Sequence, residues 1–520
     1  MNDPVKNNET LPEIEEKPSE EILSEDDTLN PKYEKGNTSF IGAFLQIGNT
    51  ILGAGIISLP VVFRYLGFIL GFIFITIISI LSIYSSYLLL KAHQITSKKK
   101  YLTIAHASMG DKGYIFTNII IILNNFGLSC VYFRIVADTL QNIIGGYVSK
   151  DNFFVKNWHN FIYIIIILLI MSFVVWTKDF KKFEKTSFLG MFGIIVYFII
   201  LIILFFYKIS KGFKPFHSLN SYFISGKFTD ILICLPSVFL SFSFQFNLFP
   251  IYSTLIKRTH KEMLNVTKAS IIFCFILYIF SGIIGFLMYG DSLDDTILNA
   301  FLTEIQNEKN DLTVKILLII ANIGFLLCST TSIPLVFYTL KQNFFSTYKF
   351  IIRNKNKKKI EMEIEEENNK ITDINSLGIN DEGEITNTNT VITDNNISID
   401  KENERNDSIG SNESIDEINK KIKINITKNE ENIISLLIYI IIGCVTILVP
   451  NLKSMFNIIG CTAANSIQFI IPCLMIICLK KKSEKLLNLI LVKILLIFGL
   501  ISLIICFIAE IIHIFINIDD

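Results

Sequence analysis

The chain has 520 residues, 51% of them hydrophobic, and its 47 basic side chains balance its 47 acidic ones, so net charge says nothing about partners. The mean hydropathy is +0.50, and apolar runs recur that can cross the roughly 30 Å hydrocarbon core of a bilayer. This composition excludes a soluble globular domain and predicts an all-α polytopic protein embedded in the lipid bilayer. None of the nine cysteines has disulfide or zinc spacing, so we expect no metal site.

Eleven transmembrane helices are expected along the chain, because each apolar segment is at or near spanning length. They cover residues 39–63, 67–90, 114–146, 160–176, 187–207, 229–254, 266–289, 313–340, 432–450, 455–479 and 486–515. Residues 39–348 then form a core of eight spans, and residues 432–520 carry spans 9 to 11. The polar, acidic residues 1–38 show no cleavable signal peptide and predict a disordered cytosolic tail.

Lysine and arginine concentrate in alternate loops, so the positive-inside rule orients the chain. The basic loops contain Lys98–Lys100, Lys178–Lys185, Lys257–Lys261 and Lys480–Lys485. This pattern places the N-terminus in the cytosol, and eleven spans place the C-terminus on the opposite side. Segment 208–227 is the exception, since its four lysines fall on that opposite side.

Residues 349–431 interrupt the series of spans. They are rich in Asn, Glu, Ile and Lys, lack large apolar clusters and predict a disordered cytosolic loop. A regulatory segment and a tolerated expansion both fit this composition, and we favour the expansion.

The first span contains GNTILGAGIISLP at residues 48–60, where glycines and polar residues weaken a helix inside the membrane. Unpaired backbone groups cost several kcal/mol each in hydrocarbon, so an unwound segment persists where it binds something. Freed amides suit an anionic group, and freed carbonyls with the Asn49 side chain suit a cation. The residues expected to bind the substrate in this span are Thr50, Gly53, Ala54 and Gly55. Close helix packing at the glycines is the alternative.

A second interrupted span supports the binding hypothesis. Residues 232–252 carry two prolines and several polar side chains, with Ser241 and Phe242 at the centre. Because spans 1 and 6 are five apart, we expect a 5+5 inverted repeat with an eleventh helix appended. In span 8, Thr331 and Ser332 either bond their own helix carbonyls or complete a cation site with Asn49, and the spacing leaves both open.

Asp and Glu are scarce in spans 1, 6 and 8, so the expected site suits a zwitterion better than a cationic amine. Its carboxylate would contact the span 1 amides, and its ammonium would contact backbone carbonyls and Ser241. No phosphate-binding loop, nucleophile–His–Asp arrangement or metal cluster stands in the sequence. We therefore expect no enzyme, no catalytic residues and no nucleic-acid partner.

Other polar residues inside the spans are weaker candidates for a functional role. Arg134 and Asp138, spaced i, i+4 in span 3, form either an ordinary ion pair or an extracellular gate. Glu510 and His513 in span 11 suggest a proton relay, although such residues more often face the membrane interface. Tyr278 fits packing better than substrate contact.

These residues resemble the amino acid/auxin permease family, which includes neutral amino acid transporters of the system A and N type. Asn49, Gly53, Gly55 and Pro60 are similar to its first-span pattern, Asn-x-x-x-Gly-x-Gly followed by Pro. Residues 235–290 resemble its spans 6 and 7, from the Leu-Pro start to the closing Tyr-Gly. The similarity covers residues 39–348 and 432–515.

The resemblance implies a leucine-transporter-like fold with alternating access, and amino acid symport with Na⁺ or H⁺. In Na⁺-driven members a span 1 Asn and a span 8 Thr are associated with the ion, which implies Asn49 and Thr331 or Ser332 here. This sequence departs from the family where counting from Pro334 gives Ser332, and where Gln245 stands in place of a His of some relatives. Both departures leave the coupling ion open.

We therefore expect a secondary active transporter of neutral or varied amino acids, with Na⁺ or H⁺ as coupling ion and no other cofactor. An amino acid sensor of the same fold, signalling through its tail or loop, is the alternative, and a channel ranks last. The plasma membrane and a vacuolar or lysosome-like membrane both fit. The sequence indicates no partner proteins.

Overall fold

Apolar helices make up almost all of the described chain. The computed structural model describes residues 36, 38–145, 147–148, 160–176, 183–213, 228–293, 296–307, 311–377, 427–449, 452–480 and 489–519. Within these ranges, nine helices are long and apolar enough to cross a membrane, and shorter apolar helices cover Phe40–Gly53 and Phe161–Trp176. The expectations for residues 1–35 and 378–426 fall outside the described residues.

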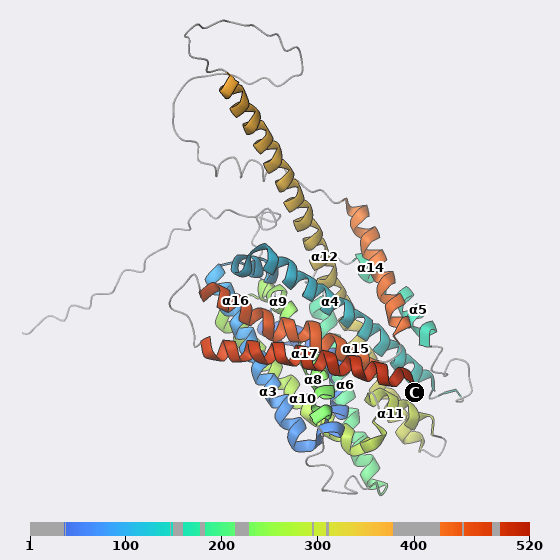
Figure 1. The fold of residues 1–520 in the computed structure, drawn as a ribbon. Helices are drawn as coiled ribbons and strands as arrows, with labels where there is room; N and C mark the ends of the chain where they lie inside the picture. The colour runs from blue at the N-terminus through green and yellow to red at the C-terminus, as the bar shows by residue number, and fades with distance from the viewer. Residues whose placement is uncertain are drawn as a thin grey trace, which may run out of the picture.

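The helices follow one another in a single bundle (Figure 1). They are α2 (Phe40–Gly55), α3 (Leu59–Thr96), α4 (Tyr101–Gly145), α5 (Asn160–Ile170), α6 (Phe183–Ser210), α8 (Phe228–Ser241), α9 (Leu248–Thr254), α10 (His260–Tyr289), α11 (Ile297–Ile305), α12 (Leu312–Leu377), α14 (Lys428–Leu448), α15 (Leu452–Ile459), α16 (Ile471–Lys480) and α17 (Leu489–Asp519). Two π-helical turns, Gly460–Ala464 and Ser466–Ile470, join α15 to α16.

Burial separates the central spans from the peripheral ones. In Thr229–Thr254, 83% of the apolar window is buried, against 28% in Lys428–Leu448 and in Leu489–Ile512. The exposed large side chains of α14 and α17 are mainly Ile and Leu, as contact with lipid requires. The sixth span therefore lies at the centre of the bundle.

The first span consists of two half-helices. α2 ends at Gly55, Ile56–Ser58 form a turn, and the chain becomes helical again at Leu59. The Ser58 hydroxyl donates to the Gly55 carbonyl at 2.9 Å, which satisfies one acceptor at the break. Gly67, with φ of +73°, then turns the chain into the second span, a conformation that glycine adopts without strain.

The sixth span is broken as well. α8 ends at Ser241, residues 242–244 are not helical, and a 3₁₀ turn at Gln245–Asn247 leads into α9. The interruption expected from the prolines and polar residues of this span is present. In the first span an interruption is present too, but at residues 56–58 and not at the glycines.

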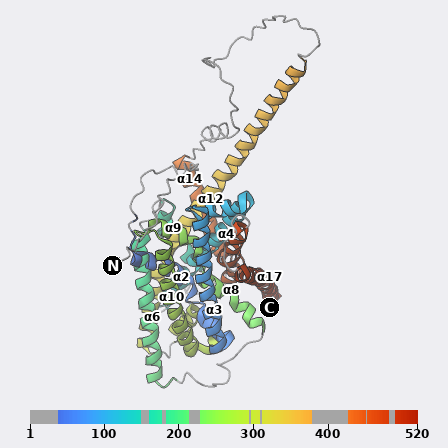
Figure 2. The ribbon, with the colours of Figure 1, turned by 90° about the vertical axis from the view of Figure 1, so that its left-hand side faces the viewer.

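α12 continues for 66 residues and extends far beyond the bundle (Figures 1 and 2). The expectation of disorder from residue 349 onward is therefore wrong for residues 349–377. This stretch contains no Gly or Pro, and its Lys-rich part is followed by a Glu-rich part. Both residue types favour helices, and opposite charges three or four positions apart stabilise one further.

The residues before α2 lie against the end of α9. The Thr38 N–H donates to the Thr254 carbonyl at 3.0 Å, and the Ile256 N–H donates to the Thr38 carbonyl at 3.0 Å. The approach is close, because a β-carbon on Gly36 would lie 1.8 Å from the Leu255 carbonyl oxygen. The entrance to the first span is thus tied to the exit of the sixth.

Candidate functional site

The end of α2 approaches side chains from three other helices. A β-carbon on Gly53 would lie 2.2 Å from the hydroxyl oxygen of Tyr132 on α4. One on Gly55 would lie 2.4 Å from the hydroxyl oxygen of Tyr278 on α10 and 2.7 Å from Oγ of Ser241 on α8. All three side chains are buried. Residues 53 and 55 must therefore be glycine for these contacts to form.

The free amides differ from those expected. Since α2 remains helical through Gly55, the amides of Gly53, Ala54 and Gly55 bond within their own helix. The first turn of α3 instead leaves the N–H groups of Leu59 and Val61 without an intrahelical acceptor. An anionic group at the break would meet these two amides. The side chain of Ala54 lies outside the described residues.

Tyr278 connects the two broken spans. Its hydroxyl lies within hydrogen-bond distance of the Ile51 carbonyl and 2.9 Å from the Ser241 carbonyl. Its ring meets Phe242 edge to face, with 5.2 Å between the ring centroids. We expected Tyr278 to pack and not to form these hydrogen bonds, because the sequence does not show which groups a Tyr in an apolar span faces.

Side chains from neighbouring spans satisfy the backbone where span 6 is broken. The Phe242 carbonyl accepts from the Ser82 hydroxyl at 3.2 Å and from the Gln468 amide at 3.3 Å. Gln245 accepts from the Phe244 N–H at 3.0 Å and donates to Ser82 at 3.0 Å. The unwound segment is therefore stable inside the bilayer without unpaired groups at these positions. Ser241 itself donates to the Ser237 carbonyl at 2.7 Å.

Asn49 and Thr331 come together beside α6. Asn49 Oδ1 and Thr331 Oγ1 lie 2.4 Å and 2.3 Å from the position that a β-carbon on Gly190 would take. Asn49 is fully buried, and its Nδ2 has no hydrogen-bond partner among the described residues. Two convergent oxygens, one of them on the fully buried Asn49, can coordinate a small cation, so these residues suit the ion site expected from the sequence.

Two neighbouring span 8 hydroxyls bond their own helix. Ser332 donates to the Cys328 carbonyl at 3.0 Å, and Thr330 donates to the Leu326 carbonyl at 2.8 Å. Thr331 also reaches the Cys328 carbonyl, at 2.9 Å, but its oxygen remains beside Asn49. Of the two residues expected at the ion site, Thr331 is therefore better placed than Ser332.

Thr50 faces the second half of the broken span 6. The Asn247 amide donates to the Thr50 hydroxyl at 3.5 Å, and the Thr339 hydroxyl donates to Asn247 Oδ1 at 3.1 Å. Asn247 thereby links spans 1, 6 and 8. Its location within the polar run of span 6 was apparent in the sequence, but its two partners were not.

Arg134 and Asp138 form the expected ion pair on α4. Nε of Arg134 lies 3.1 Å from Oδ1 of Asp138, and the two side chains are 12% and 13% exposed. Because both side chains are largely buried, water and salt screen this pair less than a solvated surface pair.

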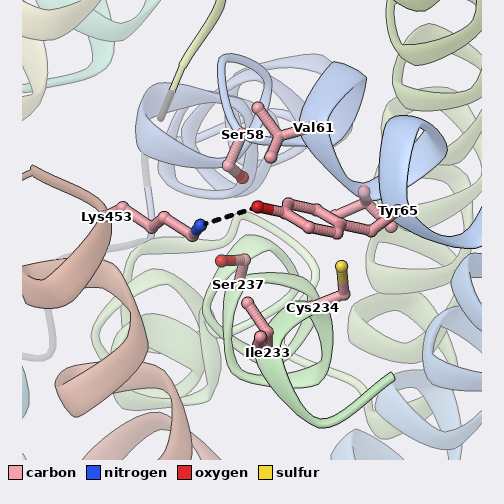
Figure 3. A pocket seen from close by; sticks show the side chains of 8 residues that line it. Ser58, Val61, Tyr65, Ile233, Cys234, Ser237 and Lys453 are labelled. Carbon is pink, nitrogen blue, oxygen red and sulfur yellow. Dashed lines mark hydrogen bonds between the residues drawn. The ribbon is translucent and has the colours of Figure 1, made fainter. Parts of the chain in front are cut away.

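A narrow cavity lies beside the first turn of α3, between α8 and α15 (Figure 3). Its volume is about 10 Å³, enough for one water molecule. Lys453 points into it from α15, with its ammonium nitrogen 3.4 Å from the Tyr65 hydroxyl and 5.0 Å from the ring centroid. Ser58 and Ser237 supply hydroxyls from the two broken spans.

A charged cluster lies where α6 ends near the start of α12. The Tyr207 hydroxyl donates to Asp311, the Thr313 N–H donates at 3.3 Å, and the Lys211 ammonium lies 3.5 Å away. The hydrogen bond from Tyr207 is the main reason why the pKa of the Asp311 carboxyl is lowered from 3.8. Tyr207, Lys211 and Asp311 line a cavity of about 580 Å³.

A family model described as "Transmembrane amino acid transporter protein" matches residues 36–516. The chain belongs to this family. The resemblance to the amino acid/auxin permeases is thereby confirmed, and the protein is an integral multi-pass membrane protein of a transporter family and not an enzyme.

Two relatives of this family member show how far the similarity extends. The amino acid transporter AVT6E of Arabidopsis thaliana is 23% identical over 321 residues, or 60% of this chain and 64% of that protein. The chain therefore spans less than two thirds of that relative. The sodium-coupled neutral amino acid symporter 2 of Danio rerio is 23% identical over 355 residues, or 62% of this chain and 67% of that protein.

The fold of this family member is similar to that of a solved structure. The structure of MhsT in complex with L-phenylalanine aligns with a TM-score of 0.53 at 11% identity, covering 90% of this chain and 98% of that one. The two chains therefore share an all-helical fold.

Sequence reasoning missed two residues of the site. Tyr132 lies in the third expected span, two residues before Arg134, and nothing in the sequence indicated a contact with Gly53. Gly190 has no polar group at all, and only the three-dimensional structure shows that its missing side chain makes room for Asn49 and Thr331.

Proposed function

We propose that this protein is a secondary active transporter that moves neutral or varied amino acids by alternating access, coupled to Na⁺ or H⁺. The observation that carries the proposal is the meeting of two broken helices at Gly55 and Ser241, with Tyr278 between them. Half-helix ends near mid-membrane offer amides to a carboxylate and carbonyls to an ammonium or a cation. Phe242 of the expected binding set lies in the span 6 break, and Gly55 directly precedes the span 1 break.

The proposed substrate site keeps the expected residues and adds two tyrosines. Its members are Thr50, Gly53, Ala54, Gly55, Ser241 and Phe242, with Tyr132 and Tyr278. The substrate carboxylate would contact the Leu59 and Val61 amides, and the ammonium would contact carbonyls at the end of α8. Asn49 and Thr331, with Ser332 behind them, would hold the coupling cation. The buried Arg134–Asp138 pair would act as a gate.

We further propose eleven spans in a 5+5 inverted repeat plus one. The two shorter apolar helices, Phe40–Gly53 and Phe161–Trp176, supply the first and fourth spans beside the nine longer ones. Breaks in the first and sixth spans support the repeat. The alternate basic loops support a cytosolic N-terminus, in a plasma membrane or a vacuolar or lysosome-like one.

Transport is tested with purified protein in proteoliposomes, using a panel of labelled amino acids under imposed Na⁺ or H⁺ gradients. We expect saturable, stereospecific uptake that Gly53→Leu abolishes, and a higher cation concentration for half-maximal uptake in Asn49→Ala. Uptake no greater than in empty liposomes for every amino acid would overturn the proposal.

An amino acid sensor of the same fold is the second candidate, because α12 carries span 8 continuously to Leu377. Removing residues 1–35 and 378–426 separates the two functions. A transporter retains its flux after this deletion. A sensor binds amino acid without appreciable flux in either form, and loses its signal.

A further inference from the structure

Glu510 stands out among the buried polar side chains. It lies on α17, which faces lipid over much of its surface, and yet its own side chain is only 4% exposed. Among the described residues it is the one carboxylate that is buried. A charged side chain buried in a membrane protein is costly, so a buried carboxyl on a membrane-spanning helix is a candidate functional site.

Two hydrogen bonds connect Glu510 to the broken span 6. Asn457 Nδ2 donates to Glu510 Oε2 at 2.8 Å, and the Ser237 hydroxyl donates to Asn457 Oδ1 at 3.0 Å. Glu510 Oε1 has no hydrogen-bond partner among the described residues. The carboxyl is therefore held by one oxygen while the other is available to take up a proton.

The chain of hydrogen bonds ends at a cavity. Ser237 lines the narrow cavity into which Lys453 points, between α3, α8 and α15 (Figure 3). Since that cavity has room for about one water molecule, the hydrogen-bonded chain from Glu510 ends beside a water-sized space.

Few other charges act on Glu510. The thiol of Cys461 interacts with it electrostatically, and with Cys506, which stands one helical turn before Glu510 on α17. Lys453 lies one turn before Asn457 on α15, but its ammonium is directed at Tyr65. Asp230 on α8 and Lys453 both interact electrostatically with the thiol of Cys234. The side chains of Lys480 and His513 lie outside the described residues.

We propose that Glu510 binds the proton that drives transport. The proton adds to Oε1 and makes the carboxylate a neutral acid, and it leaves from the same oxygen on the other side of the transport cycle. The change of charge alters the bond from Asn457, and through Asn457 the position of Ser237 on the first half of span 6. The amide and hydroxyl oxygens of Asn49 and Thr331 do not titrate, so a proton needs a separate site.

The inference rests on the proposed function, and a conservative variant tests it. Glu510→Gln keeps the shape of the side chain and an oxygen that accepts from Asn457, but it cannot bind a proton. In proteoliposomes with an imposed pH gradient, we expect uptake by this variant to fall at least about tenfold, while exchange of labelled for unlabelled amino acid stays within about a factor of two. A pH dye trapped in the liposomes should report amino-acid-induced proton entry for the wild type alone.

Two further variants separate coupling from folding. Glu430→Gln removes an exposed carboxylate at the start of α14 and should behave as wild type in both assays. Asn457→Leu tests the positioning residue, and it should weaken the response to the pH gradient while exchange continues.

The outcomes are distinct. Equal acceleration of Glu510→Gln and wild type by the pH gradient would overturn the inference. Wild-type uptake driven by Na⁺ alone would overturn it too, while leaving the proposed function intact. Absence of any amino acid flux or exchange in the wild type would instead overturn the proposed function.

Discussion

The hydroxyl of Tyr132 occupies the space that any side chain at residue 53 would need, since a β-carbon there would lie 2.2 Å from the phenolic oxygen. Gly53→Ala must therefore displace Tyr132 from the proposed substrate site. We expect a loss of uptake of at least tenfold, about 1.4 kcal/mol of transition-state stabilisation, measured in proteoliposomes. Adding Tyr132→Phe should restore part of it, because the phenolic oxygen is the nearest atom.

The matched control is Gly48→Ala on the same helix. A β-carbon on Gly48 would meet only the terminal methyl group of Met191, which is flexible and can move aside. Uptake should stay within a factor of about two of the wild type. Equal losses of uptake for the two variants would show that α2 tolerates alanine at neither position, and that contact with Tyr132 is not the cause.

Asn49→Ala and Thr331→Ala remove the two oxygens that meet beside Gly190. Each should raise the cation concentration for half-maximal uptake by roughly tenfold, because one oxygen ligand is lost at a site that offers few. Thr330→Ala is the control, since its hydroxyl bonds the Leu326 carbonyl instead. Unchanged cation dependence in both site variants would show that the cation does not bind at this location.

Tyr278→Phe leaves the Ile51 and Ser241 carbonyls without their shared donor in a buried setting. We expect a decrease of about 1–3 kcal/mol in the free energy of unfolding, visible as a lower Tm in detergent. Tyr147→Phe removes a hydroxyl from a residue that is 77% exposed, and should leave the Tm unchanged. A Tyr278→Phe protein as stable as the control would contradict the bridging role.

The lowered pKa of Asp311 predicts how the stability of the folded protein depends on pH. Because its pKa in the folded protein is below 3.8, its ionised contacts stabilise the folded state above that pH and are lost as the pH falls through the lowered value. Asp311→Asn should therefore lower the Tm equally at about pH 7 and about pH 5, with the difference from wild type shrinking only in stronger acid. A difference that already disappears near pH 5 would contradict the lowered pKa.

The sequence predicted that spans 1 and 6 are interrupted, because glycine, proline and polar residues stand where a lipid-facing helix would carry Leu. The exact position of the first break could not be predicted. Gly53 and Gly55 looked like the unwound residues, yet their role is to let Tyr132 and Tyr278 approach. A glycine pattern alone does not distinguish backbone freedom from lack of a side chain.

Contacts between distant parts of the chain were also beyond prediction. Asn49 and Thr331 were expected together through the family resemblance, but Gly190, which makes room for them, carries no chemical group to notice. The helix over residues 349–377 was missed for another reason. Its polar composition indicated disorder, although it lacks helix breakers and alternates blocks of opposite charge.

Span 8 and the extension beyond it are one uninterrupted helix, so Thr331 and Leu377 are parts of the same rod. At 1.5 Å per residue, the part beyond Tyr348 is about 40 Å long, and a tilt of about 10° at its base would sweep the tip through about 7 Å. A small tilt of α12 near Thr331 would thus displace the tip of the helix by about the length of a side chain. α12 therefore connects the proposed cation site at Thr331 to a point well outside the bundle.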